Sequence, residues 1–462
     1  MVEDLCFLFL WFLFPFLWHL LLKSAGLSML RVSIPSIVIV AIYIYQYVGL
    51  PVLYFQLDWQ RAVLVTDKYL ILQVFFFTSI TISFMLLGFI IARGHCGSLD
   101  YRKYVNMKSN IFNTSMIRIF NYSKYSVFRL HIGLLSSITA SFLVLIVYLS
   151  KVGIQNVALF IALNSTSGEL STGEARSAMG TSFDGSYHWY KLFTHDVLIF
   201  SLLVLTGLYL IQKRIITFVL LIPTFIIATL VMVMATEKTQ MAELVISLFL
   251  VYTLIKNEGK ISIRKFLPVV IILVSILSLF YIYFMDSENL ESAIISLSSR
   301  LFTGQIQSAY HYLDYFQNNH DYLLGRSFPN PGGIFPFEHT EITTEVMAWQ
   351  FPNEIALGIV GSMPTIFWGD MYANFGILGV LCVPFFVGYL IYFINSIVLR
   401  QAFTPLSVGL FVWLILHFKV IAQTSVTSFF MDIYMLTIIS VFIILSFFVG
   451  KGIMYFKTRT NI

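Results

Sequence analysis

Three arginines stand in polar or aromatic segments of an otherwise hydrophobic chain: Arg176, Arg300 and Arg326. A guanidinium group presents a planar fork of N–H donors that matches the oxygens of a phosphate. We therefore expect at least two of these side chains to bind a phosphorylated ligand. The alternative is that they form ion pairs with acids of the same loops, with Glu169, Glu174 and Glu345 as possible partners.

Lys238 is a fourth candidate cation, in the short turn ATEKTQ between two apolar runs. Such a short turn holds the ammonium group near the helix ends, and three roles stay open for it. It could pair with Glu237, pair with Glu243, or contact a bound phosphate.

Proton transfer calls for a base, and His311 and His339 could serve, although a lone histidine is more often structural. The chain contains no HxxxH or HExxH spacing, so it predicts no zinc site. Asp286 and Glu288 form the close acid pair that a metal-dependent sugar transferase would need, but this signal is weak. No Walker A loop, GxSxG elbow or dinucleotide fingerprint occurs, so the sequence predicts no cofactor and no metal.

The elements that position these residues are predicted to be membrane-spanning helices. The chain has 462 residues, of which 58% are hydrophobic and 11% charged. Its apolar residues come in runs of about twenty, the length that crosses a bilayer core. We expect about 11 spans (10–12) in an all-α, polytopic transmembrane helical bundle. They cover residues 4–22, 34–56, 69–92, 130–150, 192–211, 215–235, 241–256, 266–285, 372–396, 405–423 and 429–449.

The distribution of Lys and Arg predicts the orientation of these spans. The loop 93–129 holds seven basic residues against one acid, Asp100, which is typical of a cytoplasmic loop. Alternation then places most of the 28 Lys and Arg residues inside, the N-terminus outside and the C-terminus inside. The first span begins with the acidic MVED, so we expect no cleaved signal peptide. The net charge of +5 follows from this topology, so we expect no nucleic acid partner.

Two outer segments of a single membrane domain, 1–462, are long enough to be structured: the loops 151–191 and 286–371. Apolar residues at helical spacing in 290–318 predict helices on the outer membrane surface. The Pro and Gly residues of 329–333 predict a loop, and 341–362 is a further helix or a re-entrant piece.

Sequence motifs in the second outer loop resemble those of a known family. They are SRLFTGQIQSAYHYLDYF, the LLGRSF that follows it, and a G-x-x-Y-x-x-F-G-x-x-G run from Gly369 to Gly379. With the topology, they resemble the bacterial oligosaccharide repeat unit polymerases (Wzy type) of O-antigen and capsule assembly. The resemblance implies a GT-C-like bundle in the bacterial cytoplasmic (inner) membrane.

The resemblance also implies a reaction and its residues. Glycans linked to undecaprenyl pyrophosphate are joined into lipopolysaccharide O-antigen or capsular polysaccharide, beside a flippase and a Wzz-type chain-length regulator. The implied pyrophosphate-binding residues are Arg176, Lys238, Arg300 and Arg326, and the candidates for the base are His311, Glu345 and Asp370. The Arg-x10-Gly spacing of some members is missing, because Tyr187 and His311 stand where that glycine would be.

Two other functions fit the topology. An O-antigen ligase uses the same donor, but the histidines here do not reproduce the ligase pattern. A lipid-linked oligosaccharide flippase or transporter would carry charges deep in many spans, whereas the charges here favour the outer half.

Overall fold

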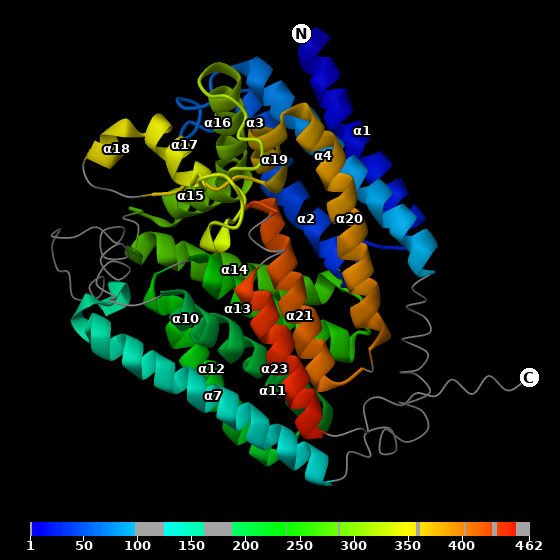
Figure 1. Ribbon diagram of the computed structural model, residues 1–462, viewed down its shortest axis with the longest axis vertical. Coiled ribbons are helices and arrows are strands. Elements are labelled where there is room, and N and C mark those ends of the chain that lie inside the picture. The colour runs from blue at the N-terminus through cyan, green and yellow to red at the C-terminus, as the bar shows by residue number, and fades with distance from the viewer. Residues whose placement is uncertain are drawn as a thin grey trace, which may run out of the picture. The chain divides into compact units, whose positions relative to one another are not determined.

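The computed structural model describes residues 2–97, 124–160, 187–236, 238–284, 287–356, 361–401, 403–426 and 432–449, and these contain helices and no β-strand. Ten of the helical segments are long and apolar enough to cross a membrane. The eleventh predicted span is α23 (Ile433–Val449), whose 17 residues are at the short end of that range. The all-α polytopic bundle is therefore confirmed (Figure 1).

The chain divides into two compact units. The first comprises residues 1–99, 286–396 and 417–432, and the second comprises 100–285, 397–416 and 433–462. The basic loop 93–129 and the outer loop 151–191 fall largely outside the described residues.

The first unit contains four of the candidate membrane spans and most of the segment 286–371, the predicted large outer loop. Its long helices are α1 (Val2–Ser24), α2 with α3 (Ile34–Gln46 and Leu50–Tyr54), α4 (Lys68–Cys96) and α20 (Ile377–Arg400). The backbones of α4 and α20 lie close together where glycines face them. A Cβ added to Gly88 would be only 2.3 Å from the Phe385 carbonyl oxygen, and one added to Gly388 would be 2.3 Å from the Met85 carbonyl oxygen. Small residues permit such backbone approach in membrane helices.

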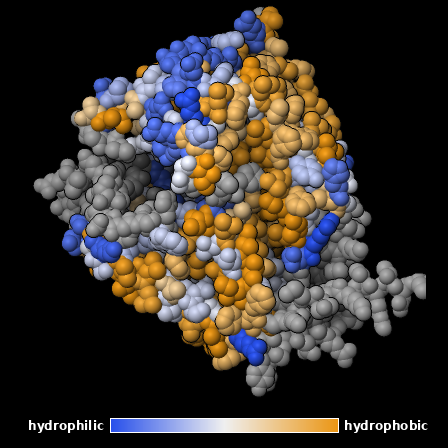
Figure 2. Space-filling view, viewed as in Figure 1, coloured by the Kyte–Doolittle hydropathy of each residue, from blue (hydrophilic) through white to orange (hydrophobic). Residues whose placement is uncertain are grey.

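The segment 286–371, predicted to be an outer loop, is largely helical in its described residues. The predicted helices in 290–318 are confirmed as α15 (Leu290–Phe302) and α16 (Gly304–Asn318), and α17 (Ile342–Gln350), α18 (Pro352–Ala356) and α19 (Phe367–Phe375) follow. Figure 2 shows hydrophobic residues over α4 and α20 and hydrophilic residues over α16.

The second unit holds α7 (Lys124–Val152), the short η1 (Ile154–Asn156) and α10 (Tyr187–Lys191), a π-helical turn η2 (Leu192–Val197) and α11 (Leu198–Gln212). It continues with α12 (Ile215–Met234), α13 (Lys238–Lys256), α14 (Ile263–Phe284), most of α21 (Pro405–Lys419) and α23. Helices α11, α12 and α13 pack against one another, and α23 packs along α7.

Candidate functional site

The corner between α15 and α16 builds the polar site of the first unit. Asn289 is the N-cap of α15, and its side-chain oxygen accepts a hydrogen bond from the Ser292 amide in a capping box. Thr303 is the C-cap of the same helix. Gly49 lets this corner approach closely, because an added Cβ would meet the Phe302 carbonyl oxygen at 2.1 Å. The buried Thr303 hydroxyl donates to a carboxylate oxygen of Asp58. These contacts hold the segment after α3 against the corner between α15 and α16.

Arg61 lies in the same segment after α3, and its guanidinium group contacts side chains of α15 and α16. Its Nη1 donates to the side-chain oxygen of Gln307 at 2.7 Å, and its Nε lies 3.4 Å from the Ser299 hydroxyl. Its position near the end of a span suggests a headgroup anchor. The structure instead places its guanidinium group among the polar side chains of α15 and α16.

Arg300 joins Arg61 over Gly304. Both Arg61 Nη2 and Arg300 Cδ lie 3.4 Å from the position that a Cβ on Gly304 would occupy. Arg300 is exposed, and its guanidinium group makes no hydrogen bond or ion pair within the described part of the chain. We call these two residues the Gly304 arginine pair: the part-buried Arg61 and the exposed Arg300 bring two positive charges to one helix corner, and guanidinium groups are suited to phosphate oxygens.

His311 lies one turn beyond Gln307 on α16. Its Nε2 is 3.2 Å from the Gln307 amide nitrogen, while its Nδ1 has no hydrogen-bond partner among the residues described. The side chain is 1% exposed, and burial lowers the pKa of its imidazole to about 4. The imidazole is therefore neutral near pH 7 and a weaker base than an exposed histidine.

Glu345 is the more accessible base candidate. Its Oε1 accepts a 2.7 Å hydrogen bond from the Tyr315 hydroxyl and lies 3.5 Å from His320 Nε2, and its side chain is 33% exposed. The Tyr315 ring stacks on His320 and packs against Trp349, which also faces the ring of His311 at 6.5 Å. The rings of Tyr315 and Trp349 therefore connect two of the base candidates, His311 and Glu345.

Asp370 is hydrogen-bonded to the loop 325–341. Its Oδ1 accepts from the Ser327 hydroxyl at 2.9 Å and from Asn374, whose own side-chain oxygen accepts from the Gly325 amide. The carboxyl is 2% exposed, and burial raises its pKa to about 6 against the lowering effect of these hydrogen bonds. Direct proton transfer to Asp370 would require this loop to move.

Arg326 and the aromatic residues Phe335 and Phe337 lie in that loop. The Arg326 side chain is exposed, and its backbone carbonyl accepts from the Thr340 amide at 2.9 Å. Asn330 fixes the loop tip by donating to the carbonyl oxygens of Phe335 and Phe337, whose rings stack at 5.6 Å.

The remaining predicted cations belong to the second unit. Lys238 opens α13, and its Nζ lies 3.3 Å from the centre of the Tyr281 ring, a cation–π contact. Arg176 lies outside the described residues, and so does Asp286 of the acid pair noted in the sequence. Over the described ranges, no cluster of three or more His, Cys, Asp or Glu side chains is found.

The G-x-x-Y-x-x-F-G-x-x-G run has a physical explanation. Gly376 separates α19 from α20 with a φ of +60°, a left-handed conformation that favours glycine. An added Cβ on Gly379 would meet the Met371 carbonyl oxygen at 2.3 Å. The motif therefore shapes a tight turn that holds α19, and with it Asp370, against the start of α20.

Comparison with known proteins adds no relative. No family model, no curated protein and no solved structure matches the chain. Interpretation of the site therefore rests on its own residues.

Two residues of the site, Arg61 and Gln307, are absent from the sequence prediction. Arg61 carries a usable signal, because it is a cation on the predicted outer side of the membrane, where fewer of the Lys and Arg residues lie. Gln307 carries none, since a glutamine in an amphipathic helix is ordinarily a solvent-facing residue.

Proposed function

We propose that this protein is a glycosyltransferase of a bacterial cytoplasmic membrane that polymerises oligosaccharide repeat units linked to undecaprenyl pyrophosphate. The observation that carries the proposal is the Gly304 arginine pair, in which Arg61 and Arg300 lie side by side on a polar segment of a membrane protein. A lipid pyrophosphate has both an anionic group for these cations and a chain for the bilayer.

The proposed reaction needs only groups that the chain and its substrates supply. The acceptor sugar hydroxyl attacks C1 of the donor glycan, a new glycosidic bond forms, and the C1–O bond to pyrophosphate breaks. Undecaprenyl pyrophosphate leaves with the bonding electrons, and the arginine pair stabilises the charge that grows on it. The hydroxyl proton passes to a base.

Glu345 is our first choice for that base. It is partly exposed and has its hydrogen-bonding partner Tyr315 fixed in place, whereas His311 is buried and Asp370 is covered by the loop 325–341. Exposed aromatic side chains such as Phe335 offer faces on which sugar rings stack. Arg326 in the same loop is positioned to contact glycan or phosphate, and Arg176 and Lys238 remain predicted pyrophosphate ligands in the second unit.

The test is a polysaccharide ladder from cells that lack this gene, complemented with the wild type or with Arg61→Ala, Arg300→Ala or Arg326→Ala at checked expression. We expect loss of the gene to leave a single repeat unit on the lipid core, and Arg61→Ala or Arg300→Ala to fail to restore the ladder. Lys213→Ala, a basic residue of the α11–α12 turn, is the control and should restore it.

Other outcomes point to the alternatives. Loss of even the single repeat unit would favour a flippase or a ligase. A normal ladder from both arginine variants would exclude the arginine pair as the substrate site.

A further inference from the structure

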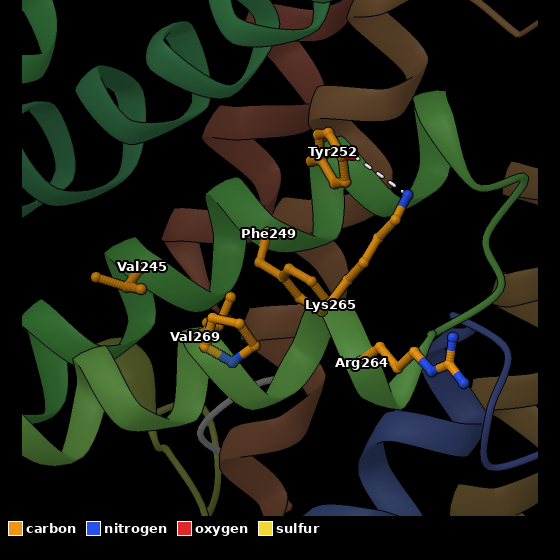
Figure 3. A pocket seen from close by; sticks show the side chains of 7 residues that line it. Val245, Phe249, Tyr252, Arg264, Lys265 and Val269 are labelled. Atoms are coloured by element: carbon orange, nitrogen blue, oxygen red, sulfur yellow. Dashed lines mark hydrogen bonds between the residues drawn. The ribbon is translucent and has the colours of Figure 1, made fainter.

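A groove between α13 and α14 lies at the basic end of these two helices. It has a volume of about 520 Å³, within the range of ligand sites. Its lining comprises Val245, Phe249, Tyr252, Arg264, Lys265, Pro268 and Val269. Figure 3 shows Val245 and Val269 toward one end and the two cations toward the other. An apolar channel with a cationic end has the shape of a lipid site.

Lys265 is held in place at the cationic end. Its Nζ donates to the Asn257 side-chain oxygen at 2.7 Å and lies 3.4 Å from the Tyr252 hydroxyl. An ammonium group has three N–H donors, so one is left for a ligand. Figure 3 shows the Lys265 side chain reaching to Tyr252.

Arg264 leaves its whole donor fork available. It is exposed and makes no hydrogen bond or ion pair within the part of the chain that the structure describes. Both cations lie in the first turn of the 22-residue α14, where the helix dipole adds positive potential. The acid of this loop, Glu258, is not part of the groove lining. The charge is therefore complementary to an anion.

The apolar end is suited to an acyl chain. The rings of Phe249 and Phe266 pack at 5.5 Å beside the groove, and Val269 and Pro268 line it from α14. Both helices are candidate membrane spans, so the groove runs from the level of the lipid headgroups into the apolar layer. Basic pockets between membrane helices bind anionic lipid headgroups.

We propose that this groove binds one anionic phospholipid, with its phosphate at Arg264 and Lys265 and an acyl chain along Val245, Phe249 and Val269. The basic residues of 256–265 place it in the leaflet that the sequence predicts to be cytoplasmic. This site is independent of the proposed glycosyl transfer, because none of its lining residues is among those proposed for that reaction.

The test is native mass spectrometry of the full-length protein released from nanodiscs of phosphatidylcholine with a minor share of phosphatidylglycerol. We expect the wild type to retain one phosphatidylglycerol selectively. Arg264→Gln with Lys265→Gln should lower the retained ratio about 30-fold, from roughly five-fold per cation. Lys213→Gln with Arg214→Gln removes the same charge from the α11–α12 turn and should retain the wild-type ratio.

A second variant tests the acyl channel without changing charge. Val269→Trp fills the apolar end and should also abolish selective retention, while added inorganic phosphate, which lacks an acyl chain, should not compete. The proposal is overturned if the two charge pairs have equal effects, if Val269→Trp retains the lipid normally, or if phosphate displaces it.

Discussion

Arg61 donates a 2.7 Å hydrogen bond to the side-chain oxygen of Gln307, a residue 246 positions away in the chain. This contact turns the Arg61 guanidinium toward α16 and places it beside Arg300 over Gly304. Gln307 also contacts His311, so one buried amide orients both a cation and a base candidate.

We expect Gln307→Leu to lower the free energy of unfolding by about 1–3 kcal/mol, because it removes a buried acceptor of a charged donor. It should also shorten the polysaccharide ladder, because Arg61 loses its orientation. Gln305→Leu is the matched control on the same helix. The buried Oε1 of Gln305 has no hydrogen-bond partner among the described residues, so this change should cost little or stabilise. Thermal unfolding in detergent compares the two, and equal losses would contradict this role for Gln307.

His311 makes stability fall with acidity. Its folded pKa of about 4 lies below the unfolded value of 6.5, so between these values the unfolded state binds the extra proton. The contribution of His311 to the free energy of unfolding should decrease as pH falls from about 6.5 to about 4, by up to about 3 kcal/mol at 1.4 kcal/mol per pH unit. His311→Gln should remove that slope. Denaturant unfolding at several pH values measures it, and an unchanged slope in the variant would count against a buried neutral imidazole.

Asp370 has the opposite effect on the pH dependence of the free energy of unfolding. Its folded pKa of about 6 is raised above the unfolded 3.8, so the folded state binds the extra proton and stability is lost as pH rises through about 6. At pH 7, Asp370→Asn should therefore be at least as stable as the wild type. Activity then separates two roles. A stable variant with a normal ladder identifies Asp370 as an anchor of the loop 325–341, and a stable variant without a ladder identifies it as the base.

Gly379→Ala should destabilise the first unit by about 1–3 kcal/mol, because its Cβ would collide with the Met371 carbonyl at 2.3 Å. Gly94→Ala is the control, since Gly94 lies in α4 with no atom within 4 Å of an added Cβ. That change should stabilise by up to about 1 kcal/mol through helix propensity. Tm measurements in detergent distinguish the pair, and a stable Gly379→Ala would show that the turn before α20 can open without cost.

Substitutions at Glu345 test the base. Glu345→Gln keeps an acceptor for the Tyr315 hydroxyl but loses the carboxylate. We expect turnover of lipid-linked repeat units to fall at least about 100-fold, the usual contribution of general base catalysis. Tyr315→Phe should cost far less, because it removes only the orienting hydrogen bond. Equal turnover by Glu345→Gln and the wild type would move the role of base to His311.

The sequence by itself determined the membrane helices and the two helices of 290–318. Their signals are local: an apolar run of about twenty residues spans a bilayer wherever it lies, and helical periodicity is a property of neighbouring residues. It also made Arg300 a candidate, because a cation inside a predicted outer loop stands out against the charge distribution of the chain.

Only the tertiary structure decided which cation joins Arg300. Arg61 lies near a span end, where snorkelling to the headgroups explains a charge equally well. Its contact with Gln307 depends on how the segment after α3 packs on α15 and α16, and Gly49 permits that packing through the absence of a Cβ. Burial of His311 and Asp370, and with it their pKa values, has the same origin, because burial is set by neighbours that are distant in sequence.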